Sequence, residues 1–192
     1  DGPVVLADVA DNPGSGATCD SVLLLKKLLE LNADHVAVAV ICDPETVRQA
    51  FTAGVGAQIQ VCLGGKQYPQ ITGGPLYCAA FVEQLTDGYI KNTGPMNNGV
   101  VLQFGDCALL KIQGIYVIVC SNHTQPYDLE IYRHCGLIPE NMKILVVKSA
   151  VHYRASFSSI ATKIDLAGKC AILILSMPLF TELVNIVKGL MS

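Results

Sequence analysis

The sequence is short of charged residues. Asp, Glu, Lys and Arg make up 15% of its 192 residues, while 51% of the residues are hydrophobic. An average soluble domain has about 25% charged residues. A chain with so few charges has either an unusually large core or an apolar surface that meets another chain or domain. We favour the second interpretation, and a homo-oligomer is among the arrangements that it allows.

Further absences exclude several kinds of partner. The net charge is −3 and the cationic residues are scattered singly, so the basic patch of a nucleic-acid-binding protein is missing. The longest apolar runs, such as the one over 170–180, are shorter than the roughly 18 to 20 residues that cross a bilayer. The first nine residues lack the basic start and the cleavage site of a signal peptide. We expect no nucleic-acid partner and no membrane span.

The cysteines do not have the spacing of a metal or redox motif. The chain contains no CxxC and no Cys/His pair at zinc-ligand spacing, and its four histidines are dispersed. We predict no metal site in this chain and interpret the cysteines as small buried hydrophobic residues in a reducing cytoplasm. Thiol chemistry stays open as the alternative. The eight cysteines are Cys19, Cys42, Cys62, Cys78, Cys107, Cys120, Cys135 and Cys170.

Strands and helices are predicted to alternate at the start of the chain. Continuous apolar runs over 3–9 and 36–42 are typical of strands that are covered on both faces. Apolar residues at helical spacing follow each run, over 18–31 and from Asp43-Pro44 to about Ala53. This order of strand, helix, strand and helix predicts parallel βαβ units.

The middle of the chain has a different pattern. Over 57–120, short apolar runs are separated by glycine-rich turns, which predicts an antiparallel meander. The remaining elements are expected to be a helix over 128–135, a strand over 144–147 followed by a loop and a helix, a strand over 170–175 and a closing helix over 181–191. We therefore predict a single α/β domain over 1–192, with a mixed sheet that has βαβ units at both ends of the chain and an antiparallel β-meander between them.

Polar residues follow each of the predicted parallel strands. Because the carboxyl ends of parallel strands meet at one edge of a sheet, where α/β proteins bind ligands, these residues are expected to share a cleft. Their charges are mutually complementary, which also favours one shared site. The set is Asp8, Asp11 and Asn12 after the first strand, Asp43 after the second, Ser121, Asn122, His123 and Gln125 after the strand over 115–120, and Lys148, Ser149, His152 and Arg154 after the strand over 144–147.

The turn DNPGSG over 11–16 allows two interpretations. Its backbone N–H groups, followed by a helix, could form an anion-binding nest; equally, it could be a tight turn in which Gly14 and Gly16 take positive φ. It matches neither a Walker loop nor GxGxxG. A Ser-His-Asp triad is disfavoured because the chain has no GxSxG elbow.

Four segments together resemble a known family. They are DGPVVLADVADNPGSGATCDS at the start, LGGK over 63–66, QPYD over 125–128 and VVKSAVHYRASFSSIA from 146. In these segments the chain resembles, across residues 1–168, the C-terminal domain of the microcystinase C (MlrC) family of bacterial metallopeptidases. Two departures are mild: Ser15 stands where the family more often has glycine, and Tyr153 where it more often has phenylalanine.

The resemblance implies a part of a larger enzyme. The zinc ligands of that larger enzyme are expected in an N-terminal metallopeptidase domain that this sequence does not contain. Zinc would then be a cofactor of the full-length protein, and this chain would hold none. The chain would complete the substrate cleft of a zinc-dependent peptide or amide hydrolase and be inactive alone. Catalytic roles are left unassigned. With Gln125, the residues expected to line the cleft are Asp8, Asp11, Asn12, Gly14, Gly16, Lys148, Ser149 and His152.

Two other functions stay open from the sequence. The chain could be a stand-alone module that binds phosphate or another small anion at DNPGSG with Lys148 and Arg154. It could also be a structural or dimerisation domain in which the loops serve packing alone.

Overall fold

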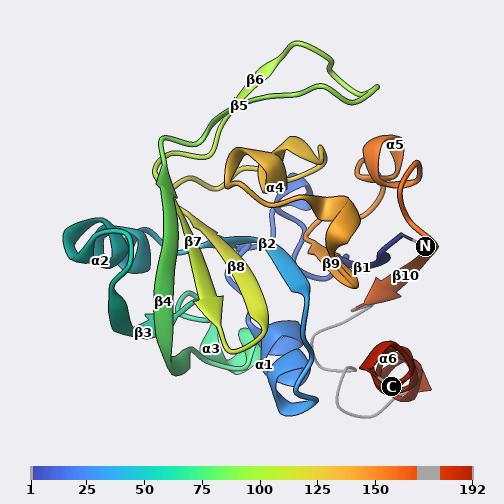
Figure 1. The fold of residues 1–192 in the computed structure, drawn as a ribbon, viewed down its shortest axis with the longest axis horizontal. Coiled ribbons are helices and arrows are strands. Elements are labelled where there is room, and N and C mark those ends of the chain that lie inside the picture. The colour runs from blue at the N-terminus through green and yellow to red at the C-terminus, as the bar shows by residue number, and fades with distance from the viewer. Residues whose placement is uncertain (1, 168–177, 192) are drawn as a thin grey trace.

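One large mixed sheet carries the fold in the computed structural model, which describes residues 2–167 and 178–191 (Figure 1). Within these residues the sheet has eight strands in the order β10-β1-β9-β2-β8-β7-β4-β3. The strands are β1 (Val4–Asp8), β2 (Val36–Cys42), β3 (Gln58–Leu63), β4 (Leu76–Thr86), β7 (Cys107–Ile112), β8 (Ile115–Cys120), β9 (Ile144–Val147) and β10 (Lys163–Ala167).

The sheet has a parallel half and an antiparallel half that meet at β8. Strands β10, β1, β9, β2 and β8 pair in parallel, whereas β8, β7, β4 and β3 pair antiparallel in sequence order. A separate hairpin of β5 (Tyr89–Lys91) and β6 (Val101–Gln103) is inserted between β4 and β7 and projects from the body (Figure 1). The predicted α/β fold with a central meander is confirmed, except that the apolar run containing β6 pairs with β5 in the separate hairpin and not within the meander.

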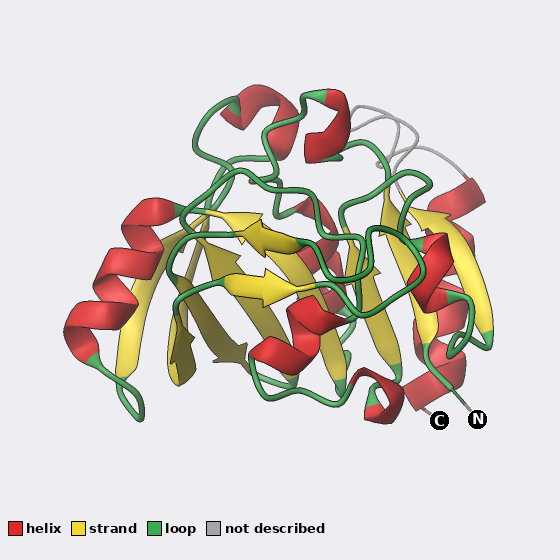
Figure 2. Cartoon of the chain, turned by 90° about the horizontal axis from the view of Figure 1, so that it is seen from above, coloured by secondary structure: helices red, strands yellow, loops and turns green. Residues whose placement is uncertain are grey.

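Helices cover both faces of the parallel half (Figure 2). On one face the parallel half packs against α1 (Leu23–Glu30) and α6 (Pro178–Met191), while α2 (Pro44–Ala53) lies on β8, β7, β4 and β3. On the other it packs against α4 (Glu130–His134) and α5 (Arg154–Phe157). Burial on both faces explains why β1, β2 and β9 read as continuous apolar runs. Three short segments complete the fold: α3 (Pro69–Thr72) and the 3-10 turns Pro13–Ser15 and Pro139–Asn141.

The antiparallel half has one face that helices leave open. On β4 the side chains of Tyr77 and Phe81 are exposed, Tyr77 by 75%. The same strand turns Ala80 and Val82 into the core on its other face. An apolar surface of the kind suggested by the low charge content therefore lies on β4.

Some predicted boundaries shift in the structure. The helix expected from residue 18 begins at Leu23, because the Asp11 carboxylate accepts the backbone N–H groups of Cys19 and Ser21 and holds 18–21 in a loop. The strand β10, which pairs in parallel with β1, was not predicted; its sequence KIDLA alternates polar and apolar residues at a sheet edge. The strand expected over 170–175 lies outside the described residues.

Seven cysteines lie in the described part of the chain and all are free thiols. Burial raises the pKa of the Cys135 thiol to about 12, while a hydrogen bond with the Cys120 thiol lowers the pKa of Cys42.

In the described part of the chain, no helix combines the length and apolar character that a bilayer span requires.

Candidate functional site

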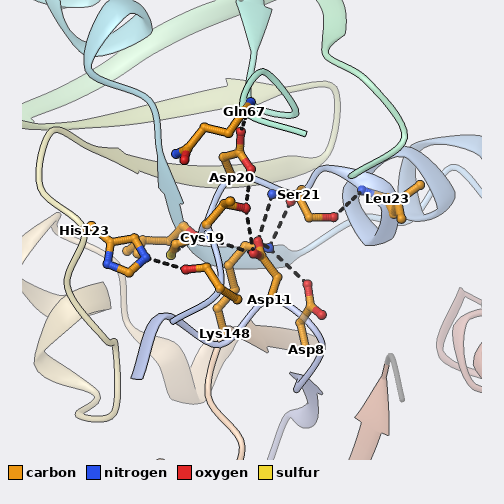
Figure 3. Close-up of polar contacts among 12 residues, drawn as sticks. Asp8, Asp11, Cys19, Asp20, Ser21, Leu23, Gln67, His123 and Lys148 are labelled. Atoms are coloured by element: carbon orange, nitrogen blue, oxygen red, sulfur yellow. Dashed lines mark hydrogen bonds and ion pairs between the residues drawn. The ribbon is translucent and has the colours of Figure 1, made fainter. Parts of the chain in front are cut away.

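Two turns that are far apart in sequence meet at the carboxyl edge of the parallel strands (Figure 3). One is the DNPGSG turn after β1, and the other follows β9 and begins at Lys148. The register explains the meeting, since Ala7 of β1 pairs with Val147 of β9. The next residues along the two strands, Asp8 and Lys148, therefore lie side by side at the strand ends.

The Lys148 ammonium is enclosed by acceptors. Its Nζ donates to Asp8 Oδ2 at 3.0 Å, to Asp11 Oδ2 at 2.8 Å and to the Ser21 carbonyl at 2.9 Å. All three residues of this ion cluster, Asp8, Asp11 and Lys148, are buried. Burial alone would lower the pKa of Lys148, but the two carboxylates outweigh it and raise that pKa. Three acceptors use the three N–H donors of the ammonium, so Lys148 has none left for an outside anion.

Asp11 organises the loop that follows it. Its Oδ1 accepts the Cys19 backbone N–H at 2.8 Å and the Thr18 hydroxyl at 3.2 Å, and its Oδ2 accepts the Ser21 N–H at 2.8 Å. Together with Lys148, these contacts direct the carboxylate inward. A buried acid with charged and backbone partners stabilises one loop conformation, and this loop supports the surface turn at 12–17.

Asp20 connects the loop to a second motif of the sequence. Its Oδ2 accepts the backbone N–H groups of Lys66 at 2.8 Å and Gln67 at 3.0 Å, and its carbonyl accepts the Gly65 N–H. The backbone here comes so close that a Cβ on Gly64 would lie 2.4 Å from the Asp20 carbonyl oxygen. The sequence predictions did not include this role of Asp20. The glycine pair in LGGK was the available signal for a close backbone approach.

A chain of amide groups and an imidazole lies outside the ion cluster. Asn12 Oδ1 accepts the Gly14 N–H at 3.0 Å and Gln125 Nε2 at 3.0 Å. Gln125 Nε2 also donates to Ser149 Oγ at 3.1 Å, and Gln125 Oε1 lies 3.2 Å from His152 Nδ1. These contacts join the segments after β1, β8 and β9 into one network.

The outer surface of this network carries two histidines. His152 is exposed, and its ring makes a T-shaped contact with Tyr127, with the centroids 6.3 Å apart. His123 is also exposed, and its Nε2 contacts the Ala17 carbonyl (Figure 3). Between them the turn presents Gly14, Ser15 and Gly16 to the solvent. We call these five residues the polar rim.

The structure brings the nine predicted residues to one edge, in two layers. The ion cluster is the inner layer; Asn12, Gln125, Ser149 and His152 form the outer one, with Gly14 and Gly16 beside them. Other strand-end residues lie elsewhere. Asp43 caps α2, Ser121 and Asn122 contact the 103–106 segment, and the Arg154 guanidinium lies over the Tyr153 ring. Whether the nine residues line a substrate cleft stays a prediction.

The described residues include no group of three or more His, Cys, Asp or Glu side chains that could hold a metal ion. The carboxylates of Asp8 and Asp11 are already paired with Lys148. The donor set of the described chain therefore does not fit a metal centre by itself.

We expect Gly14→Ala to disturb the outer layer. An added Cβ would lie 2.3 Å from Gln125 Oε1, so the amide must move, at a cost of about 1–3 kcal/mol in unfolding free energy. Urea denaturation measures the cost. Gly16→Ala is the matched control: nothing lies within 4 Å of its Cβ, but its φ of +87° is strained for alanine. The NMR signals of the Gln125 amide should therefore shift in Gly14→Ala and stay in place in Gly16→Ala; the same spectrum for both would contradict the contact.

The chain is similar to a known sequence family and to two longer proteins. The sequence family described as MlrC C-terminus matches residues 6–168. Microcystinase C from a Sphingomonas species is 28% identical over 162 residues, which are 84% of this chain and 31% of that protein. The crystal structure of a candidate metallopeptidase from Mesorhizobium sp. BNC1 superimposes with a TM-score of 0.78 at 26% identity, covering 93% of this chain and 36% of that one. The chain thus spans about a third of the length of these relatives.

Proposed function

The chain belongs to the MlrC C-terminal family, and from this premise we propose that it is the domain that completes the substrate cleft of a metal-dependent peptide or amide hydrolase. The family match and the two relatives support a metallopeptidase-related domain. Both relatives are about three times longer than the part that matches. This difference in length supports a partner domain N-terminal to this one, in which the metal ligands would lie.

The observation that carries the proposal is the junction between the two turns. Segments after β1, β8 and β9 are joined through Gln125, whose amide contacts Asn12, Ser149 and His152 at 3.0–3.2 Å. The ion cluster beneath fixes the position of this network, and the polar rim above it is exposed. A rigid base under an exposed set of hydrogen-bonding groups is what a substrate-positioning surface requires.

The parts of the reaction would divide between the domains. Zinc in the partner domain would polarise the scissile carbonyl and activate water. This chain would contribute the polar rim, in which His152 can hydrogen-bond to the substrate and the backbone of Gly14, Ser15 and Gly16 can approach it closely. The isolated chain is expected to be inactive because its described residues form no metal centre.

The test is His152→Ala in the full-length protein. We expect kcat/KM for a cleaved peptide to fall about tenfold, as for the loss of one substrate hydrogen bond of about 1.4 kcal/mol. Since His152 is exposed, the unfolding free energy should change by less than about 0.5 kcal/mol. Steady-state kinetics and urea denaturation measure the two effects.

The control is His35→Asn. His35 is also exposed, but it precedes β2 and so lies at the opposite end of the parallel strands, and the variant should keep full activity. Unchanged kcat/KM in His152→Ala would remove the proposed role of the polar rim. Micromolar binding of inorganic phosphate to the isolated chain, measured by calorimetry, would instead favour an anion-binding module.

A further inference from the structure

The outer layer forms a chain of hydrogen bonds whose direction is fixed at one end. The backbone N–H of Gly14 can only donate, so the side-chain atom of Asn12 that faces it must be the oxygen Oδ1. The same Oδ1 faces the amide of Gln125 at 3.0 Å. Gln125 must therefore turn its NH₂ group toward Asn12, because two amide oxygens would repel each other.

The contact of Gln125 with Ser149 is compatible with this orientation, since a hydroxyl can accept. The two hydrogens of Nε2 have two acceptors, Asn12 Oδ1 and Ser149 Oγ at 3.1 Å. A flipped amide would lose the bond to Asn12, because Oδ1 can only accept. Its Oε1 consequently points to His152 Nδ1 at 3.2 Å. Since Oε1 can only accept, Nδ1 of His152 must carry a hydrogen whenever this bond is made.

The hydrogen on Nδ1 decides what His152 offers to the solvent. In a neutral imidazole only one ring nitrogen carries hydrogen, so Nε2 of His152 has a free lone pair. His123 has the opposite arrangement. Its Nε2 faces the Ala17 carbonyl, which can only accept, so the neutral His123 ring carries its hydrogen on Nε2. The two exposed histidines of the polar rim are thus held as different tautomers.

We propose that Gln125, oriented by Asn12, is a positioning residue that holds neutral His152 as the Nδ1–H tautomer, so that the exposed Nε2 accepts a hydrogen bond from an N–H group of the substrate. The ligand class is an N–H donor such as a peptide amide. The substrate role rests on the proposed function, whereas the tautomer rests on the contacts of this chain alone. Gly14 has a part in the arrangement, because only a residue without Cβ lets Gln125 approach the turn this closely.

NMR of the ¹⁵N-labelled chain tests the tautomer. Long-range ¹H–¹⁵N spectra recorded at about pH 8, above the usual histidine pKa of about 6.5, distinguish the two ring nitrogens. We expect an Nδ1–H pattern for His152 and an Nε2–H pattern for His123. In Gln125→Met, which has similar length but only a weakly accepting thioether, His152 should change to the Nε2–H form that free histidine prefers, and His123 should not change.

Ser15→Ala is the matched control in the same turn. Its hydroxyl contacts the Asn12 carbonyl and not the amide chain, so the His152 tautomer should persist. An Nε2–H pattern for His152 in the unmodified chain, or an unchanged Nδ1–H pattern in Gln125→Met, would overturn the inference. If Gln125→Met fails to fold, the spectrum of the unmodified chain still decides the tautomer.

Kinetics of the full-length protein test the substrate role separately. With a short fluorogenic peptide as probe, Gln125→Met should lower kcat/KM about as much as His152→Ala, and the double variant should show no further loss. If the spectra agree with the proposal but neither substitution changes kcat/KM, the tautomer stands and the substrate role is wrong. If the losses multiply, Gln125 does not act through His152.

Discussion

Lys148→Met should lower the free energy of unfolding by about 3–5 kcal/mol, the usual cost of removing one partner from a buried ion pair. Methionine fills most of the volume of lysine but leaves the carboxylates of Asp8 and Asp11 without their cation. Both acids are buried. Among the described residues, Lys148 is the one side chain that bonds to the Asp8 carboxylate. Two uncompensated acids in the interior account for the size of the effect.

The matched control is Lys143→Met. Lys143 pairs with Asp34 at 3.0 Å, but the two side chains are 38% and 46% exposed. Water screens such a pair, so its loss should cost less than about 1 kcal/mol. Urea denaturation followed by circular dichroism measures both variants. Equal losses for the two lysines would show that the ion cluster does not stabilise the fold in the way that the contacts indicate.

A second substitution tests the cause of the Lys148→Met effect. Adding Asp8→Asn to Lys148→Met removes one of the two unpaired charges, so part of the lost stability should return.

The pH dependence of the Lys148 contribution to stability has a defined sign. Because the folded state raises the pKa of Lys148, its contribution is complete below the unfolded-state pKa of about 10.4 and is lost only as the pH rises above it. Titration of Lys148 should therefore add no pH dependence to the stability of the unmodified chain around neutral pH.

Asp43→Ala should lower the free energy of unfolding by about 2–4 kcal/mol. The carboxylate caps α2 through the Thr46 N–H at 3.2 Å and also accepts the Gly64 N–H at 2.9 Å. Loss of a cap costs about 1 kcal/mol, and a buried N–H without a partner costs about 1–3 kcal/mol more. Urea denaturation measures the total, and hydrogen exchange at the Gly64 amide should become faster.

Glu45→Ala provides the comparison for Asp43. Both acids bind the Lys66 ammonium, Asp43 at 2.9 Å and Glu45 at 2.8 Å, but their side chains are 2% and 72% exposed. The exposed partner should contribute less than about 1 kcal/mol. A loss in Glu45→Ala as large as that in Asp43→Ala would mean that the Lys66 ion pair, and not the buried N–H groups, carries the stability of this loop.

Elements with local signals were predicted closely. The strand over 36–42 and the strand over 144–147 match β2 and β9, because continuous apolar runs are typical of strands buried on both faces. The helix α2 starts and ends as expected, since Asp43 caps it, Pro44 fits its first turn and Gly54 follows its end. The beginning of α1 was wrong, because Asp11, which lies outside the helix, binds the backbone of Cys19 and Ser21.

The sequence predicted where in the sheet the two turns lie, but not which side chains contact one another there. The expected parallel direction of the strands was enough to place the DNPGSG turn and the Lys148 turn at one edge, as the rule for parallel sheets indicates. The sequence did not distinguish the buried Lys148 from the exposed His152, although they are four residues apart. It also gave Gln125 no special place among the residues after β8. Both distinctions depend on contacts with segments more than 20 residues away.

By itself, the sequence determined the α/β class, the limits of β2, β9 and α2, and the family to which the chain belongs, because these depend on periodicity, local capping and motifs within short segments. Only the tertiary structure decided which polar groups of the motifs face inward and which face the solvent. The reason is the β1–β9 register, which sets the Asp8 and Asp11 carboxylates around one ammonium and leaves the imidazole of His152 outside. Charge neutralisation in the interior and hydrogen-bond direction at the surface are properties of that assembly and of no single segment.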